Sequence, residues 1–263
     1  MKITDNVFVV TGAGNGMGCQ VLLGLVRRGA RVAAVDLDEH GLTETERLAR
    51  IARGTVSTHA VDVTDRAAIA ALPSAVTAVH GQIDGVVNMA GIVHRFVPFT
   101  ELADDEVDRI IDVNFWGTVT MSRAFLPILR QRPEATLTNM SSLAALVPFA
   151  GQMFYGASKG AVKLFSEGLY AELLDTNVRV VTIFPGNVST NIAGNSGVQP
   201  VDAGGRKVRA TTPEVAGERI VEGIAKDSFR VVIGADAHLL DTLARVSPKR
   251  TTAFIAKQMK SVL

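Results

Sequence analysis

The chain has 263 residues, 47% of them hydrophobic and 20% charged, which is enough for one large α/β domain or two small ones with a sizeable core. Its 27 basic and 26 acidic residues leave a formal net charge of +1, which argues against nucleic acid or an acidic membrane surface as a partner. The one cysteine, Cys19, cannot form an internal disulfide, and no apolar run approaches the ~20 residues of a membrane helix. We therefore expect a cytoplasmic protein with no membrane partner.

Short Val-rich runs alternate with longer helical patterns along the chain. The expected strands cover residues 7–11, 31–36, 55–61, 85–89, 135–140, 178–184 and 230–234. The expected helices cover residues 16–29, 39–52, 65–80, 104–130, 152–175, 213–226 and 235–246. Several strands are apolar on both faces, as in a parallel sheet that is covered by helices on each side. The pattern predicts an α/β fold with a doubly wound parallel sheet of about seven strands, and we expect Pro127 to kink or restart the fourth helix.

Residues 187–212 differ in composition from the rest of the chain. They are rich in Gly, Asn, Ser and Thr, and they are many for a structureless connection inside a compact domain, where such loops tend to be functional lids. We interpret the segment as a substrate-binding flap, with a disordered surface excursion as the alternative. Since no linker or low-complexity tract divides the sequence, residues 1–263 are expected to form one catalytic domain.

The first strand runs into a glycine-rich turn at residues 12–18, and a helix follows. Glycines let the backbone turn sharply and approach a pyrophosphate closely, while the helix N-terminus presents free N–H groups to the phosphates. Asp36 ends the second strand, where a carboxylate can accept hydrogen bonds from both ribose hydroxyls of adenosine. It would also repel the 2′-phosphate of NADP, and the next residue, Leu37, offers no cation. The sequence therefore predicts a dinucleotide site that prefers NAD.

Tyr155 and Lys159 stand four residues apart in an expected helix, and Ser142 stands thirteen residues before Tyr155. Residues four apart on a helix share one face, so the ammonium of Lys159 can approach the phenol of Tyr155. A phenol titrates near pH ~10, and bringing its pKa to about 7 requires roughly 4 kcal/mol. One nearby positive charge supplies an interaction of that size. We therefore expect Tyr155 to have a lowered pKa and to exchange protons near neutral pH.

Taken together, these residues resemble the usual single-domain branch of the short-chain dehydrogenase/reductase family over essentially the whole chain. Four further motifs carry the resemblance: Asp62-Val63, Asn88-Met89-Ala90-Gly91, Val113-Asn114-Phe115-Trp116-Gly117 and Pro185-Gly186-Asn187-Val188-Ser189-Thr190. The family usually has Asn where Met89 stands, and we expect this to change how that turn is braced, because methionine lacks the hydrogen bonds of an amide. The resemblance implies a Rossmann-type fold and an NAD-dependent oxidoreductase that interconverts a secondary alcohol and a ketone.

The resemblance also implies a role for individual residues. Tyr155 would be the general base in alcohol oxidation and the acid in carbonyl reduction, and Lys159 would lower its pKa and bind the nicotinamide ribose. Ser142 would position the substrate oxygen and Asn114 would hold a relay water; a turn or capping role for Ser142 and a helix-bracing role for Asn114 are the alternatives. The implied NAD-binding residues are Gly12, Asn15, Gly16, Met17, Gly18, Asp36, Leu37, Asp62, Val63, Asn88, Ala90, Gly91, Tyr155, Lys159, Pro185, Gly186, Val188 and Thr190. No metal is expected, because the five histidines are scattered.

The residues expected around the substrate are largely apolar. They fall within 92–96, 143–149, 152–154 and the flap, and they include Phe96, Leu143, Leu146, Phe149, Met153 and Ile192. An apolar cavity with one polar end suits a steroid-, terpenoid- or acyl-like secondary alcohol or ketone. Arg95, Arg206 and Arg209 are the candidates for holding an acidic substrate. His94 and Arg95 are interpreted either as the border of the substrate mouth or as an exposed surface pair.

Other functions remain alternatives at this point. A 3-oxoacyl-carrier-protein reductase usually uses NADPH, against which Asp36 counts. A catalytically silent NAD-binding or scaffold protein should show a broken Ser–Tyr–Lys set, which is whole here, and the glycine spacing disfavours an epimerase or dehydratase. The resemblance further implies a homodimer or homotetramer formed through the helices near 104–130 and 152–175. Residues 246–263 either pack against a partner subunit or cover the pocket.

Overall fold

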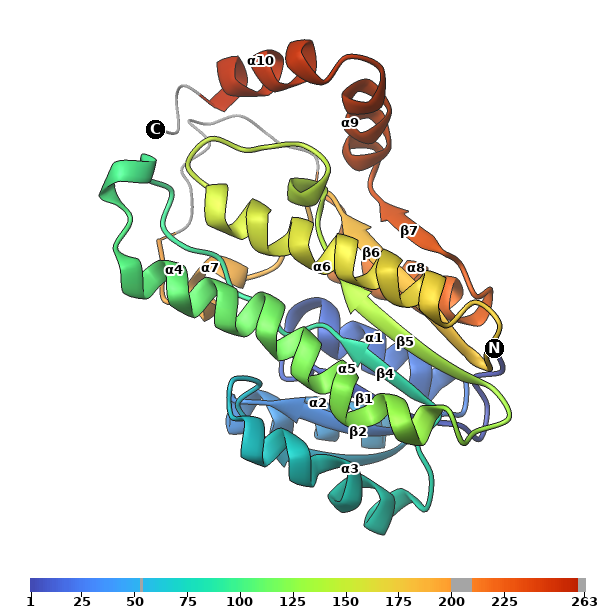
Figure 1. Ribbon diagram of the computed structural model, residues 1–263. Coiled ribbons are helices and arrows are strands. Elements are labelled where there is room, and N and C mark those ends of the chain that lie inside the picture. Colours follow the sequence, from blue (N-terminus) through green and yellow to red (C-terminus); the bar gives the residue numbers. More distant parts are fainter. Residues whose placement is uncertain (53, 200–209, 260–263) are drawn as a thin grey trace.

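A computed structural model describes residues 1–52, 54–199 and 210–259, and in it one parallel sheet carries helices on both faces (Figure 1). The strands are β1 (Val7–Thr11), β2 (Arg31–Asp36), β3 (Thr55–Ala60), β4 (Gly85–Asn88), β5 (Ala135–Met140), β6 (Val178–Pro185) and β7 (Arg230–Ile233). The helices are α1 (Gly16–Arg27), α2 (Glu39–Ile51), α3 (Arg66–His80), α4 (Asp104–Ile111), α5 (Gly117–Leu129), α6 (Met153–Glu172), α7 (Ile192–Asn195), α8 (Pro213–Ala225), α9 (Ala235–Val246) and α10 (Pro248–Met259), with short turns η1 (Phe99–Glu101), η2 (Asp112–Trp116) and η3 (Leu143–Ala145). The predicted doubly wound α/β fold is confirmed, and each strand ends within one residue of its expected end.

Alternate residues of β1 face opposite layers of helices, as the pleat of a strand requires. Val7 and Val9 pack with residues of α3 and α5, whereas Phe8 and Val10 pack with residues of α1 and α8. All four side chains are fully buried. A strand that is apolar on both faces is stable only between two such layers, and this explains why the central strands lack polar alternation.

The strand order in the parallel sheet is β3-β2-β1-β4-β5-β6-β7. Strands β2 and β3 are added on one side of β1 and strands β4 to β7 on the other, so the order of addition reverses between β1 and β4, where Thr11 pairs with Asn88. In open parallel sheets, ligands bind beyond the carboxyl ends of the strands at such a reversal. The glycine turn after β1, Asp36 at the end of β2 and residues 88–91 at the end of β4 therefore meet at one place.

The helical stretch at residues 104–130 differs from the prediction. A π-helical turn, η2, separates α4 from α5, and α5 continues through Pro127 to Leu129. The expectation that Pro127 restarts the helix was therefore wrong: the proline removes one intrahelical hydrogen bond, and the buried side chains of Phe125 and Leu129 on either side of it keep this turn packed. The irregular turn instead contains Asn114, and π turns inside helices frequently occur at functional sites.

Two segments contain structure that the sequence did not predict. Within the expected flap, residues 192–195 form α7, and Val188 pairs with Thr211. After α9, the chain forms α10, whose Ile255 is buried beside Leu143 and Val147. The C-terminal segment thus packs on the loop after β5 of its own chain. Residues 200–209 of the flap and 260–263 of the C-terminal segment lie outside the described residues.

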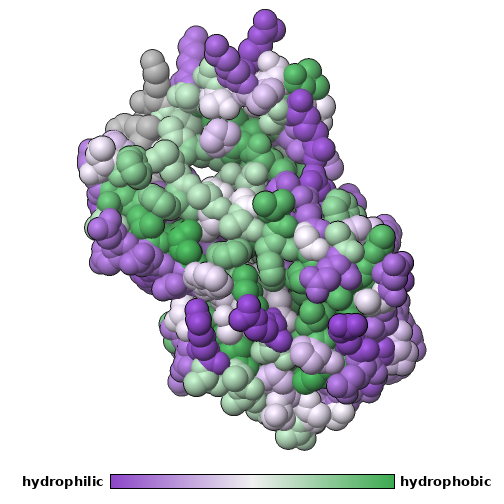
Figure 2. Space-filling view, viewed as in Figure 1, coloured by the Kyte–Doolittle hydropathy of each residue, from purple (hydrophilic) through white to green (hydrophobic). Residues whose placement is uncertain are grey.

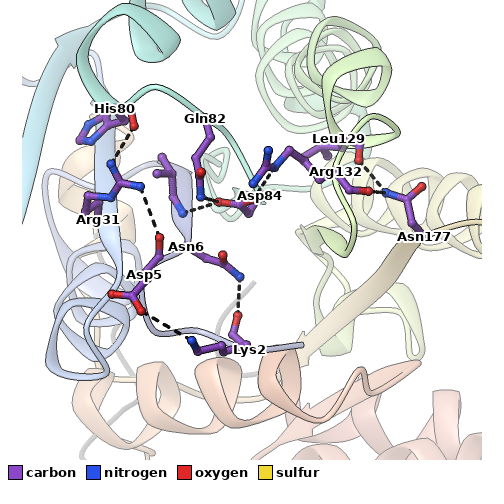
Figure 3. Close-up of polar contacts among 11 residues, drawn as sticks. Lys2, Asp5, Asn6, Arg31, His80, Gln82, Asp84, Leu129, Arg132 and Asn177 are labelled. Atoms are coloured by element: carbon purple, nitrogen blue, oxygen red, sulfur yellow. Dashed lines mark hydrogen bonds and ion pairs between the residues drawn. The ribbon is translucent and has the colours of Figure 1, made fainter.

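A polar network ties together the amino ends of the strands (Figure 3). The carboxylate of Asp84, a residue that is 1% exposed, accepts hydrogen bonds from the Val7 N–H at 2.8 Å, the Gln82 amide at 2.8 Å and Arg132 Nε at 2.6 Å. The amide of Asn177 in turn donates to the Arg132 carbonyl at 2.6 Å. A buried charge is tolerated only when it is paired in this way, so this end of the sheet has a structural role.

Candidate functional site

A cavity of ≈ 460 Å³ lies at the carboxyl ends of β1, β2 and β4. Eleven of the predicted NAD-binding residues line it: Gly12, Asn15, Gly16, Met17, Asp36, Leu37, Asp62, Val63, Ala90, Gly91 and Thr190. The lining does not include the remaining predicted residues: Gly18, Asn88, Tyr155, Lys159, Pro185, Gly186 and Val188. The sequence analysis did not assign to the cofactor the further lining residues Asp38, Val61, Met89, Ile92, Arg109, Val113, Ile192 and Asn195. No local signal indicated Arg109, which reaches the cavity from α4.

The glycine turn is built for close approach of the backbone. Gly12 has a φ of +65°, and a Cβ on it would lie 2.8 Å from the Ala90 nitrogen; a Cβ on Gly18 would lie 1.9 Å from the Gly12 oxygen. Only glycine, which has no Cβ, fits at either position. The Thr11 hydroxyl accepts hydrogen bonds from the Met89 and Ala90 N–H groups at 3.0 and 3.1 Å. The turn after β4 is thus braced through its backbone, and Met89 needs no side-chain amide there.

Asp36 stands at the edge of the cavity. Its carboxylate accepts hydrogen bonds from the Gly14 N–H at 2.8 Å and the Asp38 N–H at 3.0 Å. A Cβ on Gly14 would come within 3.0 Å of that carboxylate, so the turn can approach Asp36 only because residue 14 is glycine. These bonds fix the orientation of the carboxylate while leaving lone pairs on both of its oxygens. The neighbouring Leu37 is 69% exposed and brings no charge to the site.

Ser142 follows β5 and begins η3. Its backbone is extended, with φ −165°, and its hydroxyl accepts a hydrogen bond from the Ala144 N–H at 3.1 Å. The capping role is therefore real, but the same hydroxyl also forms a hydrogen bond with Tyr155. The adjacent Ser141 instead donates to the Lys159 carbonyl at 2.8 Å. The fold thus distinguishes two serines that the sequence left equivalent as caps.

Tyr155 and Lys159 lie on one face of α6, with Lys159 Nζ 6.0 Å from the centre of the Tyr155 ring. Although Tyr155 is only half-buried as a residue, burial raises the pKa of its phenol, and the hydrogen bond with Ser142 acts in the opposite direction. Burial lowers the pKa of Lys159 to about 8, and Nζ donates to the Met140 carbonyl at 3.1 Å. The expectation that Lys159 lowers the pKa of Tyr155 was therefore wrong for the protein alone, because desolvation by burial disfavours the charged form of each group and raises the pKa of the phenol.

Asn114 is fully buried within η2. Its Oδ1 accepts from the Ile92 N–H at 2.8 Å, and its Nδ2 donates to the Ile92 carbonyl and the Ser158 hydroxyl, both at 3.0 Å. The bracing role is therefore present, because this amide joins the loop after β4 to α6. A Cβ on Gly91 would lie 3.0 Å from Lys159 Nζ and 3.2 Å from Asn114 Oδ1, so Gly91 allows both groups to reach the cavity wall.

A glycine turn, a carboxylate at the second strand and a buried Ser–Tyr–Lys set occur together on a doubly wound sheet. The family model for short chain dehydrogenases matches residues 6–200. The chain belongs to the short-chain dehydrogenase family. SadH of Mycobacterium tuberculosis is 38% identical over 250 residues, covering 91% of this chain and 90% of the relative. The 1-deoxy-11-beta-hydroxypentalenate dehydrogenase of Streptomyces avermitilis is 34% identical over 241 residues, covering 90% and 87%.

Solved structures of short-chain dehydrogenases resemble the fold closely. One from Burkholderia phymatum in complex with NAD has a TM-score of 0.84 at 24% identity, covering 95% of this chain and 96% of that one. One from Burkholderia cenocepacia in complex with NADP has a TM-score of 0.81 at 27% identity, covering 97% and 99%. Both nicotinamide cofactors thus occur among proteins of this fold, and the chain's own residues must decide between them.

The apolar residues expected around the substrate lie in two different places in this short-chain dehydrogenase. Leu143, Leu146 and Phe149 pack with α9 and α10 in a third apolar cluster, whereas Ile192 lines the cofactor cavity. Hydrophobic residues surround a hollow beside the N-terminal end of α6 (Figure 2). Part of the apolar lining expected from the sequence is therefore core that anchors the C-terminal helices.

The arginines expected for an acidic substrate do not provide a free cation in the described part of the chain. Arg95 forms a bidentate ion pair with Glu106, with Nε–Oε1 at 2.8 Å and Nη2–Oε2 at 2.6 Å, and this pairing lowers the pKa of Glu106 to about 2. Arg206 and Arg209 lie outside the described residues. His94 is buried while Arg95 is exposed, so the two do not form an exposed pair.

Residues 1–52, 54–199 and 210–259 show neither a metal-binding cluster nor a membrane-spanning helix. No group of three or more His, Cys, Asp or Glu side chains there could hold a metal ion. No helix in these ranges combines the length and apolar character needed to cross a membrane. Neither observation assigns a role to any residue of the cavity.

Replacing Lys159 with Met is expected to stabilise this dehydrogenase at neutral pH. Because burial lowers the pKa of Lys159 to about 8, the folded state binds fewer protons than the unfolded state between that pH and ~10.4, so wild-type stability rises through this window. After allowing for the lost bond to Met140, Lys159→Met should gain about 2 kcal/mol at pH 7. Thermal denaturation from pH 7 to 10.5 measures it, with the gain shrinking as the pH rises.

The control for this measurement is Lys226→Met, which removes a lysine side chain that is 73% exposed. It should change stability by less than ~1 kcal/mol at either pH, since exposed ion pairs contribute little. A Lys159→Met protein that is less stable than wild type at pH 7 would show that the buried amine carries no desolvation penalty.

Proposed function

We propose that the chain is an NAD-dependent oxidoreductase that interconverts an apolar secondary alcohol and its ketone. The observation that carries this proposal is the Ser142–Tyr155–Lys159 set, which is packed together beyond β5 next to a dinucleotide-type turn. Membership of the short-chain dehydrogenase family supports the reaction class. The relative named a hydroxypentalenate dehydrogenase supports a terpenoid-like alcohol as one class of substrate.

The residues of the cavity fit a nicotinamide dinucleotide. Asn15, the residue before α1, has an extended backbone and makes no side-chain cap bond, so the first N–H groups of α1 remain available for phosphate oxygens. Gly12 and Gly16, both with positive φ, give the turn the conformation for close approach. Asp36 would accept the adenosine ribose hydroxyls, and Asp62 and Val63 would contact the adenine. The bound nicotinamide would supply or accept the hydride.

In the proposed mechanism the chain's own residues orient the substrate and move one proton. The Tyr155 phenol would accept the hydroxyl proton in oxidation and donate a proton to the carbonyl oxygen in reduction. The Ser142 hydroxyl would donate a hydrogen bond to the substrate oxygen as negative charge develops on it. Lys159, between the Met140 carbonyl and Gly91, would bind the nicotinamide ribose, and Asn114 would hold a water that links Lys159 to solvent.

We further propose that residues 1–263 act as one cytoplasmic catalytic domain within a homodimer or homotetramer. Trp116 beside α5 is 41% exposed, and Leu164 on α6 is 70% exposed. These are the two helices that the family resemblance pairs across a two-fold axis. Apolar side chains left on such surfaces support pairing there, and sedimentation of the purified chain measures it.

The experiment that tests the activity is NADH formation across a panel of secondary alcohols, with NAD⁺ and NADP⁺ measured in parallel. Cyclic and terpenoid alcohols with NAD⁺ should give the highest kcat/KM. Turnover of sugars and other polyols alone would contradict the proposed substrate class, and tighter binding of NADPH than of NADH would contradict the proposed cofactor. Binding of NADH without turnover of any alcohol or ketone would instead favour a catalytically silent protein.

Replacing Asp36 with Ala is expected to weaken NAD⁺ binding and to shift preference toward NADP⁺. The variant loses charge-assisted hydrogen bonds to the ribose and the repulsion of a 2′-phosphate, so the ratio of the two Kd values should change by about 100-fold. Titration of NADH and NADPH fluorescence measures both constants. Asp36→Asn, which keeps the shape and an acceptor oxygen, should recover part of the NAD⁺ affinity and separate hydrogen bonding from charge. A ratio unchanged in both variants would remove Asp36 from the cofactor site.

A further inference from the structure

Two buried side chains near the proposed proton-transfer group have acceptor atoms with no hydrogen-bond partner. His94 is 4% exposed and Gln152 is 3% exposed. Among the described residues, neither His94 Nε2 nor Gln152 Oε1 has a partner. Buried polar side-chain atoms in folded proteins are nearly always paired, so each exception requires an explanation.

The hydrogen bonds that these residues do make determine what the two atoms can accept. Gln152 Nε2 donates to the His94 carbonyl at 2.6 Å, which places the amide oxygen on the other side. His94 Nδ1 lies 2.6 Å from the Arg95 carbonyl, and because a carbonyl only accepts, Nδ1 carries the proton. In the neutral ring Nε2 then carries a lone pair. Both orphan atoms are therefore acceptors, and both need an O–H or N–H donor.

The position of the pair connects it to the reacting end of the site. Gln152 directly precedes α6, three residues before Tyr155. His94 follows Gly91 in the loop after β4, and Val93 in that loop donates its N–H to the Ser196 hydroxyl at the end of α7 at 2.9 Å. The loop therefore runs from the Lys159 amine to Gln152, and its Val93 is bonded to the end of α7.

We propose that one of these two atoms, His94 Nε2 or Gln152 Oε1, accepts a hydrogen bond from a second polar group of the substrate, a hydroxyl or an N–H that is remote from the carbon being oxidised. This inference rests on the proposed function and narrows its substrate class to an apolar alcohol or ketone that carries one further donor. Both orphan atoms are acceptors, and in the described part of the chain the adjacent Arg95 is held by Glu106, so this pair offers a carboxylate no donor. A hydroxyl or N–H supplies one hydrogen and therefore satisfies one of the two acceptors, at a buried position where such bonds are strongest.

The test compares the reduction of 4-hydroxycyclohexanone and cyclohexanone with NADH. The ratio of the two kcat/KM values should favour the hydroxyketone by at least ~10-fold in the wild type, since a satisfied buried acceptor is worth about one factor of ten or more. The ratio should fall to near one in at least one of the variants His94→Phe and Gln152→Met, whatever loss of rate the two ketones share. Gln131→Met, at an exposed glutamine after α5, is the matched control and should keep the wild-type ratio.

Several outcomes would overturn the proposal. Equal kcat/KM for the two ketones in the wild type would do so while leaving the proposed alcohol–ketone activity intact, and this distinguishes the two failures. Reduction of neither ketone by a protein that turns over other alcohols of the panel would also overturn this inference, whereas turnover of no alcohol or ketone at all would overturn the proposed activity as well. A crystal structure with NADH and 4-hydroxycyclohexanone in which a water, and not the hydroxyl, bonds the two atoms would also overturn it. Because the wild-type comparison needs no variant, the test holds even if His94→Phe fails to fold.

Discussion

Replacing Tyr155 with Phe is expected to lower kcat by about 10²- to 10⁴-fold, the range associated with loss of a positioned proton donor. The phenylalanine keeps the ring, which lies 6.0 Å from Lys159 Nζ, and removes only the hydroxyl that bonds with Ser142. The Kd for NADH should change far less than kcat, since the substitution removes one hydroxyl of the implied NAD-binding set and no large packing change accompanies it. Initial rates of NADH formation and fluorescence titration of NADH measure the two quantities on the same preparation.

The chain offers a matched control in its one other tyrosine. Tyr170 lies on the same helix, α6, and packs against Phe229 with ring centres 4.5 Å apart. Tyr170→Phe removes the same hydroxyl far from the cavity and should leave kcat at the wild-type value. Near-normal turnover by Tyr155→Phe on an alcohol that the wild type oxidises would show that the proposed proton transfer is wrong.

Replacing Asp84 with Ala is expected to reduce the free energy of unfolding by about 3–5 kcal/mol, the cost of breaking a buried ion pair on one side. The substitution leaves the Arg132 guanidinium without its carboxylate and the Val7 N–H and the Gln82 amide without their acceptor (Figure 3). For a chain of this length the melting temperature should fall by about 10 °C. Urea unfolding monitored by circular dichroism measures the free energy.

An exposed ion pair provides the comparison for Asp84. Glu44 pairs with Arg47 on the surface of α2, with side-chain exposures of 50% and 59%, and Glu44→Ala should cost less than ~1 kcal/mol because water screens the pair. Asp84→Asn should fall between the two, as it retains an acceptor oxygen without the charge. If Asp84→Ala unfolds at the same urea concentration as Glu44→Ala, the network at the amino ends of the strands contributes little to stability.

Local patterns predicted the sheet and the site with different success. The ends of the strands were predicted to within one residue. Most strands are short runs of consecutive apolar residues, which is the pattern of a strand that is buried on both faces. Eleven cavity residues were found through motifs at strand ends, which parallel topology brings to one edge. Arg109 was not found, because its contribution depends on which face of α4 turns toward the cavity.

Other features depend on contacts between segments that are distant in sequence. The π turn at Asp112–Trp116 accompanies the bonds of Asn114 to Ile92 and Ser158, and neither partner is local. The helix α10 is amphipathic but short, and it is held by Ile255 against the loop after β5. An isolated helix of that length is marginal in water, so its own residues predicted it weakly.

The sequence by itself determined the alternation of strands and helices, the glycine turn, the place of Asp36 and the spacing of Ser142, Tyr155 and Lys159. These depend on steric and periodic rules that act over a few residues. Only the tertiary structure decided the electrostatics: burial raises the pKa of Tyr155 and lowers that of Lys159, which reverses the expectation for the phenol. The tertiary structure also buries His94 and Gln152, and it leaves one acceptor atom of each without a hydrogen-bond partner among the described residues. Desolvation depends on everything that surrounds a group, and no local pattern encodes that.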